Sequence, residues 1–304
     1  MNGLQTVVMQ IAALLTGQTP ADEADRESAR THVREWLEAA PAEKWHCKPA
    51  DFAGRLSELI TRPHLLYQGS YGWCGPAAYL NLMLRRSPFT VARYATALYD
   101  TGKASLRALS VDVSGGFPAY NNLMSFDLPK YAREWAEDHN GSELAYKHAD
   151  WIMLAALRDY GNDLVDFEGP MDDYGASAPV TDSEYVTFLE DTGIYSSVDV
   201  VRFSAGDSAN SIVTAIGAAP DVDVILVGQM SYFSQGQVLF GRHAASLVSP
   251  IEVEGSELHF SYWSWGVNLN NADLSDVTGG FTMRTSAGDF ISNIGGAIVG
   301  RGAS

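Results

Sequence analysis

The sequence predicts an α+β protein in which helices occupy the first half of the chain and an antiparallel β-sheet forms from the second half. Two observations predict this fold class. Apolar residues recur at helical spacing through much of the first 160 residues, and prolines precede several of these segments. After about residue 197, β-branched and aromatic residues gather in short runs separated by turn residues. Helices followed by strands along the chain are typical of α+β architectures.

The first 66 residues are predicted to be helical. Thr19-Pro20 and the acidic residues after them mark the start of a helix that reaches about residue 40. A second helix follows Pro49 and ends before Pro63, and an amphipathic pattern predicts a further helix over residues 4–15. We therefore expect residues 1–66 to form a helical N-terminal extension of a larger domain at 67–304.

The middle of the chain is predicted to begin with a buried helix. Small and aliphatic residues follow Pro76, and the helix ends at two arginines before Ser87-Pro88. Residues 90–160 are expected to be mostly helical. Between Arg158 and Arg202 there are eleven acidic residues and no lysine or arginine, which predicts a solvated acidic loop or cap, or else a surface that recruits a basic partner. We expect a helical and acidic insertion at about 110–195.

The last third of the chain has the pattern of a sheet. The expected strands are 197–203 and 222–230, with a helix at 207–219 between them. Two longer strand-like segments, 238–249 and 256–265, are joined by P-I-E-V-E-G-S. This order favours an antiparallel sheet.

Composition narrows the classes of partner. The 304 residues include 37 acidic and 20 basic ones, so the formal net charge is -17, which opposes binding to nucleic acid or to an anionic membrane. The two cysteines, Cys47 and Cys74, form no C-x-x-C motif, so we expect neither a disulfide framework nor a cysteine zinc site, and no cofactor.

We expect a cytoplasmic protein at synthesis, because the N-terminus lacks the basic residues of a Sec signal and no run is long enough to span a bilayer. Export by another route stays open, as does the oligomeric state.

Cys74 is the main candidate nucleophile. It stands where the glycine-rich stretch Q-G-S-Y-G-W-C enters a helix, and a helix N-terminus stabilises a thiolate. Gln68 precedes it by six residues, so its carboxamide and the backbone N–H of Cys74 are positioned to bind an oxyanion. The alternative is that Cys74 is a small buried apolar residue.

A cysteine nucleophile needs a base, and His243 is the best candidate among the seven histidines. It opens the apolar strand A-A-S-L-V-S directly after Gly241-Arg242, so a sheet can present its imidazole to the helix that carries the cysteine. The alternative is a hydrogen-bonded sheet histidine. The other six are expected to have incidental or structural roles: His32, His46, His64, His139, His148 and His259.

These motifs resemble the papain-like cysteine peptidases. Q-G-S-Y-G-W-C is similar to the oxyanion glutamine, glycine turn and nucleophile of that superfamily, and C-G-P-A-A resembles its C39-like bacterial branch. G-R-H-A-A-S-L-V followed by S-W-G is similar to the family's histidine strand and its Asn-Ser-Trp-Gly strand. The resemblance covers about residues 64–88 and 207–267.

The resemblance implies a papain-like fold, in which the helical half carries the nucleophile Cys74 and the sheet half carries His243 as general base and acid. Gln68 would complete the oxyanion hole. Trp263 stands where the family has its histidine-orienting asparagine, and an indole cannot accept a hydrogen bond from imidazole. Strand alternation puts Ser264 on the opposite face from Trp263, so we do not expect Ser264 to replace the asparagine.

Three functions follow from these expectations. The first is a cysteine hydrolase that cleaves peptide or isopeptide bonds, which would suit a bacterial effector or toxin acting on a protein or peptide substrate. The acidic net charge favours a basic substrate. The second is a glutamine deamidase or a transglutaminase-like enzyme, which uses the same acyl-enzyme. The third is a noncatalytic papain-like binding module. Residues 1–66 would be either a prosegment over the cleft or a packed structural extension.

Overall fold

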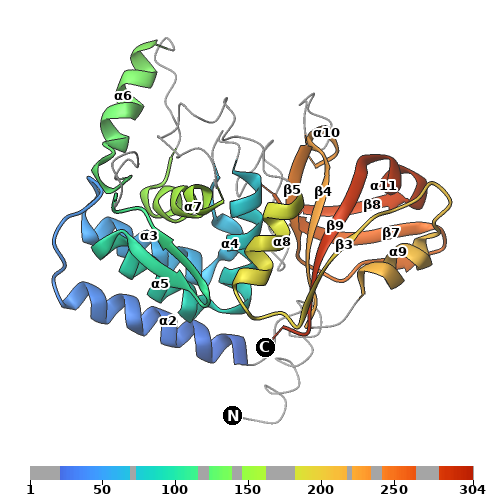
Figure 1. The fold of residues 1–304 in the computed structure, drawn as a ribbon, viewed down its shortest axis with the longest axis horizontal. Helices are drawn as coiled ribbons and strands as arrows, with labels where there is room; N and C mark the ends of the chain where they lie inside the picture. The colour runs from blue at the N-terminus through green and yellow to red at the C-terminus, as the bar shows by residue number, and fades with distance from the viewer. Residues whose placement is uncertain are drawn as a thin grey trace.

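Helices form one side of the molecule and a curled antiparallel sheet forms the other, as the computed structural model shows (Figure 1). The structure describes residues 21–68, 73–115, 123–138, 146–161, 182–217, 221–233, 242–264 and 281–303. The α+β class predicted from the sequence is confirmed, with helices in the first half and the large sheet in the second. The expected helix at 4–15 lies outside the described residues.

Most helices begin and end where the sequence signals predict. Pro49 and Pro88 occupy the first turns of their helices, and Gly102 ends one of them in a left-handed conformation that glycine adopts without strain. The helices of this half are α2 (Ala21–Glu38), α3 (Pro49–Thr61), η1 (Pro63–Leu65), α4 (Cys74–Arg86), α5 (Pro88–Thr101), η2 (Leu123–Ser125), α6 (Leu128–Asp138), α7 (His148–Tyr160) and α8 (Asp182–Asp191).

One part of the helical prediction for residues 90–160 is wrong. Strands β1 (Lys103–Leu106) and β2 (Leu109–Asp112) form an antiparallel hairpin directly after α5. Side chains alternate between exposed and buried along both strands, so one face packs on the helical core. Arg107 makes the turn at a φ of 58°. The two strands are four residues each, too short for their alternation to stand out between long helices.

The large sheet has seven strands in the order β3-β9-β4-β5-β7-β6. The strand β8 pairs with the edge of β7 that lies opposite β5 and β6. All of its strand pairs are antiparallel. The strands are β3 (Ser197–Val201), β4 (Asp223–Gln229), β5 (Arg242–Leu247), β6 (Glu252–Glu254), β7 (Glu257–Trp263), β8 (Phe281–Ser286) and β9 (Ile294–Arg301). Three further helices belong to this half: α9 (Ala209–Ile216), α10 (Met230–Phe233) and α11 (Ala287–Asn293).

The sheet separates two hydrophobic cores. One face packs on the helical half through side chains such as Val227 and Ala244. The other face is covered by α9 and α11 and contributes side chains such as Ala245 and Tyr262. Side chains alternate between the faces along each strand, so adjacent residues of β5 enter different cores.

The helices α2 and α3 share the core of the helical half. Phe52 and Leu56 are fully buried, and the ring of Phe52 lies 4.7 Å from that of Tyr99 on α5. Trp36 of α2 packs edge-on against the same tyrosine at 5.2 Å. The described residues before 66 are therefore packed against the rest of the helical half.

Candidate functional site

Cys74 is the first residue of α4, the helix that lies between the other helices and the sheet (Figure 1). The next ten residues, 75–84, are all buried, while Cys74 itself keeps partial exposure. Pro76 sits in the first turn, where no helical partner for its missing N–H is needed. Because the first N–H groups of a helix have no acceptor within it, α4 directs its positive end toward this thiol.

The second cysteine has the opposite environment. Cys47 is 2% exposed, and burial raises the pKa of its thiol to about 12, with the nearby Asp51 and Glu43 adding to the effect. A thiol of this kind stays protonated and inert at neutral pH. Cys47 is therefore not a candidate nucleophile.

The hydroxyl of Tyr185 is the polar group that meets Cys74. Tyr185 belongs to α8, and its Oη lies 3.6 Å from Cys74 Sγ. The side chain is 3% exposed, and burial together with the neighbouring Cys74 raises the pKa of the phenol well above 10. No motif in the sequence marks Tyr185. Its only signal was the helical spacing of Tyr185, Phe188 and Leu189 within the acidic segment, and all three are buried.

The helix α4 and the strand β5 run side by side in the same direction. Ser246 Oγ donates to Asn81 Oδ1 at 2.9 Å. Farther along α4, Arg86 pairs with Asp223, which lies beyond Ile225, the β4 partner of Ser246. The contact of Arg86 lies C-terminal to that of Asn81 in α4, and it lies toward the C-terminal end of β5, so the helix and the strand point the same way.

Cys74 and His243 consequently lie at the same end of these two elements. Cys74 precedes Asn81 by seven helical residues, a rise of ~10 Å. His243 precedes Ser246 by three strand residues, also ~10 Å. The fold thus brings Cys74 and the backbone of His243 to the same level along α4 and β5.

The imidazole of His243, however, is on the opposite face of β5 from α4. Ala244 and Ser246 face α4, so alternation turns His243 to the other side, where its ring lies 5.6 Å from that of Phe233. His243 Nε2 and Ser264 Oγ are 2.7 Å apart. Among the described residues, the structure brings Cys74 together with Tyr185 and His243 together with Ser264.

The contact between Ser264 and His243 was not expected from the sequence, and it lies on the face of β5 away from α4, so it does not orient the imidazole toward Cys74. Trp263 faces the helical half, where its Nε1 donates to the carbonyl of His64 at 3.0 Å, and Ser264 faces the other way. His243 shares the face of Ser264 because Ser246 pairs with Trp263 across β5 and β7. Burial lowers the pKa of His243 to about 3, so the imidazole is neutral at neutral pH.

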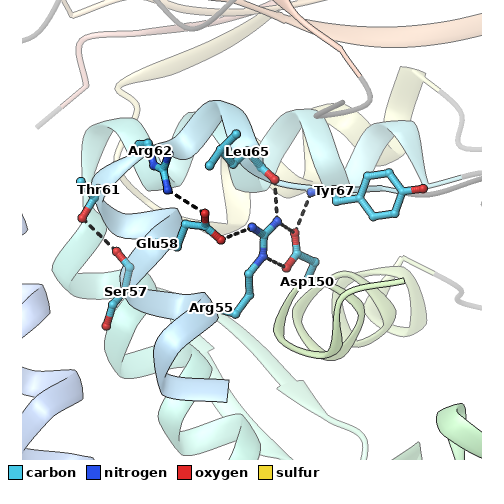
Figure 2. Close-up of polar contacts among 8 residues, drawn as sticks. All are labelled: Arg55, Ser57, Glu58, Thr61, Arg62, Leu65, Tyr67 and Asp150. Carbon is cyan, nitrogen blue, oxygen red and sulfur yellow. Dashed lines mark hydrogen bonds and ion pairs between the residues drawn. The ribbon is translucent and has the colours of Figure 1, made fainter. Parts of the chain in front are cut away.

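Gln68 ends a segment that a buried ion pair holds in place. Arg55 on α3 and Asp150 on α7 form two hydrogen bonds, of 2.7 and 2.8 Å (Figure 2). The same guanidinium donates to the carbonyl of Leu65 at 2.6 Å, and Asp150 accepts from the backbone N–H of Tyr67 at 2.6 Å. Asp150 is completely buried, and burial raises the pKa of its carboxyl despite the opposing effect of Arg55.

The same segment is also tied to α4 and to the sheet. Asn81 Nδ2 donates to the carbonyl of Pro63 at 3.0 Å, and Trp263 reaches the next carbonyl, that of His64. Gln68 itself is 4% exposed. Residues 69–72, which join it to Cys74, lie outside the described ranges. The approach to Gln68 is thus fixed by helices and sheet together.

Several further expectations fall on residues that the structure does not describe. These are His139, the part of the S-W-G motif after Ser264, and residues 162–181 of the acidic stretch. The described histidines other than His243 have contacts away from Cys74, for example His32 with Thr96 and His259 with Glu254.

No helix among the described residues has the length and hydropathy needed to cross a bilayer.

Comparison with known proteins returns no relative for this chain. No family model, no curated protein and no solved structure matches it.

Proposed function

We propose that this protein is a papain-like cysteine hydrolase that cleaves peptide or isopeptide bonds with Cys74 as its nucleophile. The observation that carries the proposal is the position of Cys74, a partly exposed thiol at the first residue of an otherwise buried helix, within reach of the Tyr185 hydroxyl. A helix N-terminus and a hydrogen-bond donor both favour the thiolate form that attacks carbonyl carbon.

The reaction proceeds through an acyl-enzyme. The thiol proton passes to a base, and the thiolate forms a bond to the carbonyl carbon while the carbonyl oxygen takes up the electron pair. Gln68 and the backbone N–H of Cys74 are the proposed donors to this oxyanion. Collapse expels the amine, which takes the proton from the base. Water then attacks the thioester, gives a proton to the base, and releases the acid and the thiol.

His243 is the proposed base, and its present orientation sets a condition on that role. The imidazole must turn from Ser264 to the α4 face of β5 before it can take the proton of Cys74. His243 is the second residue of the strand that starts at Arg242, so the required movement involves the end of β5 rather than its centre.

A noncatalytic binding module is the second candidate, and the position of His243 favours it. A histidine that is buried, neutral and bonded to Ser264 serves a structural purpose without any contact to Cys74. In this case the net charge of -17 supports a basic protein or peptide as the partner, as it supports a basic substrate for the enzyme.

The test compares the wild type, Cys74→Ala and His243→Ala after incubation with a proteome, using mass spectrometry for new peptide termini and for deamidated glutamines. New termini that disappear in both variants support the hydrolase with His243 as base. If the new termini disappear in Cys74→Ala but persist in His243→Ala, the result supports Cys74 as the nucleophile and rejects His243 as the base. Deamidation without new termini points to a glutamine deamidase, and no Cys74-dependent change in either readout contradicts both enzymes.

The proposed setting is a bacterial effector or toxin. The resemblance of C-G-P-A-A to the C39-like bacterial branch supports this setting.

A further inference from the structure

We propose that Tyr185 is a catalytic residue whose phenol donates a hydrogen bond to the Cys74 thiolate. This inference rests on the proposed function of Cys74 as nucleophile and adds a residue that the motif around Gln68 and Cys74 does not contain. It assigns the described part of the acidic segment, 182–191, a place in the active site.

The contact itself is specific. Tyr185 Oη lies 3.6 Å from Cys74 Sγ, within hydrogen-bonding distance of the larger sulfur atom, although the residues are 111 positions apart in the chain. The tyrosine side chain is buried, and within the described ranges its hydroxyl has no second polar partner. A buried hydroxyl without a hydrogen-bond partner is energetically costly, and the sulfur of Cys74 is the partner that this hydroxyl has.

The helix that carries Tyr185 is held against α4 from two sides. Phe188, one turn further along α8, stacks on Tyr79 of α4 with ring centroids 5.4 Å apart. At the first residue of α8, Asp182 pairs with Arg202 and, at 3.4 Å, with Arg242 of β5. The helix α8 is therefore held by both halves of the molecule, and its first residue pairs with Arg242, which directly precedes His243 in β5.

The chemistry of the phenol fits a donor and not a base. Its pKa is raised well above 10 by burial and by Cys74, so it keeps its proton throughout the range in which a thiol ionises. A neutral donor stabilises a thiolate relative to a thiol. The charged groups near the pair are Asp182 on α8 and Arg242 on β5, which have opposite signs and pair with each other; His243 points to the other face of β5.

The test is the pH dependence of iodoacetamide alkylation of Cys74, followed by peptide mass spectrometry in the full chain. Tyr185→Phe should move the inflection of the rate upward by about one pH unit, so that labelling at neutral pH slows roughly tenfold while the plateau at high pH is kept. Tyr79→Phe is the matched control. It removes a buried hydroxyl that has no partner among the described residues at the same α4–α8 contact, and its profile should equal that of the wild type.

An unchanged inflection in Tyr185→Phe, or an equal shift in Tyr79→Phe, overturns the proposal. Uniform labelling of the wild type with 3-fluorotyrosine gives a readout that does not depend on the folding of a variant. The more acidic phenol donates more strongly, so the inflection should move downward, and no movement contradicts the donor role. Loss of Cys74-dependent proteome cleavage is a separate measurement, so a failure of the proposed hydrolase and a failure of the tyrosine contact are told apart.

Discussion

Arg55 and Asp150 form a buried ion pair that joins α3 to α7 across 95 residues of chain and holds the backbone leading to Gln68. The guanidinium is 14% exposed and the carboxylate is fully buried. A buried charge that loses its partner keeps its desolvation cost, so each member stabilises the fold only in the presence of the other.

Replacing Asp150 with alanine should therefore lower the free energy of unfolding by ~3–5 kcal/mol, because it leaves Arg55 with Glu58 as its remaining carboxylate partner and Tyr67 N–H without its acceptor. Urea unfolding of the variant measures the loss. Arg30→Ala is the control, since Arg30 pairs with Glu23 and Glu27 at the surface and should cost less than about 1 kcal/mol. Equal effects of the two substitutions would contradict a structural role for the buried pair.

The two cysteines should react at very different rates. At pH 8 iodoacetamide should label Cys74 at least tenfold faster than Cys47, since burial keeps the pKa of Cys47 at about 12 and blocks access to it. Peptide mass spectrometry over a time course separates the two sites. Equal and slow labelling of both thiols argues against Cys74 as a nucleophile.

The buried imidazole of His243 predicts a pH dependence of stability. Its pKa is about 3 in the folded chain against 6.5 for the free side chain, so the unfolded state binds the proton more tightly. The contribution of His243 is complete above pH 6.5 and is lost as the pH falls from about 6.5 toward 3, by at most ~1.4 kcal/mol per pH unit.

Urea unfolding at pH 7, 6 and 5 measures this dependence. Other groups titrate in the same range, so the comparison is with His243→Gln. In this variant the slope of unfolding free energy against pH should be smaller, by an amount that approaches the binding of one proton, ~1.4 kcal/mol per pH unit, below pH 6. Identical slopes in the wild type and the variant are inconsistent with an imidazole that is buried and neutral.

Ser264 should matter for stability through its contact with His243. Ser264→Ala leaves Nε2 of the buried imidazole without this hydroxyl and should cost ~1–3 kcal/mol in thermal or urea unfolding. Ser292→Ala is a suitable comparison, because its hydroxyl is exposed and bonds a carbonyl of its own helix. A loss no larger than that of Ser292→Ala speaks against a contact between Ser264 and His243.

A chain that starts at Arg62 should fail to unfold cooperatively. The truncation removes α2 and α3, whose Phe52 and Leu56 are fully buried in the helical core, and it also removes Arg55, the partner of Asp150. Circular dichroism during heating checks the outcome. A truncated chain that melts cooperatively and turns over substrate faster than the full chain supports the alternative, in which residues 1–66 are an inhibitory prosegment.

Most local structure followed from the sequence because its signals are local. Pro49, Pro88 and Gly102 mark helix ends by their own backbone preferences, and the start of α4 at Cys74 could be placed to within two residues. The hairpin β1–β2 was missed because its strands are short, and no strand was assigned after residue 265, although β9 lies between β3 and β4 inside the sheet.

The sequence by itself determined the fold class and the place of Cys74 at the start of a buried helix, since both depend on residues that are neighbours in the chain. The tertiary structure alone decided which groups meet this thiol. Alternation along β5 puts His243 and Ser246 on opposite faces in any register, but only the contact of Ser246 with Asn81 selects the face that meets α4. Tyr185 reaches Cys74 because α8 packs on α4 through Phe188 and Tyr79, a contact between segments about a hundred residues apart that no local pattern encodes.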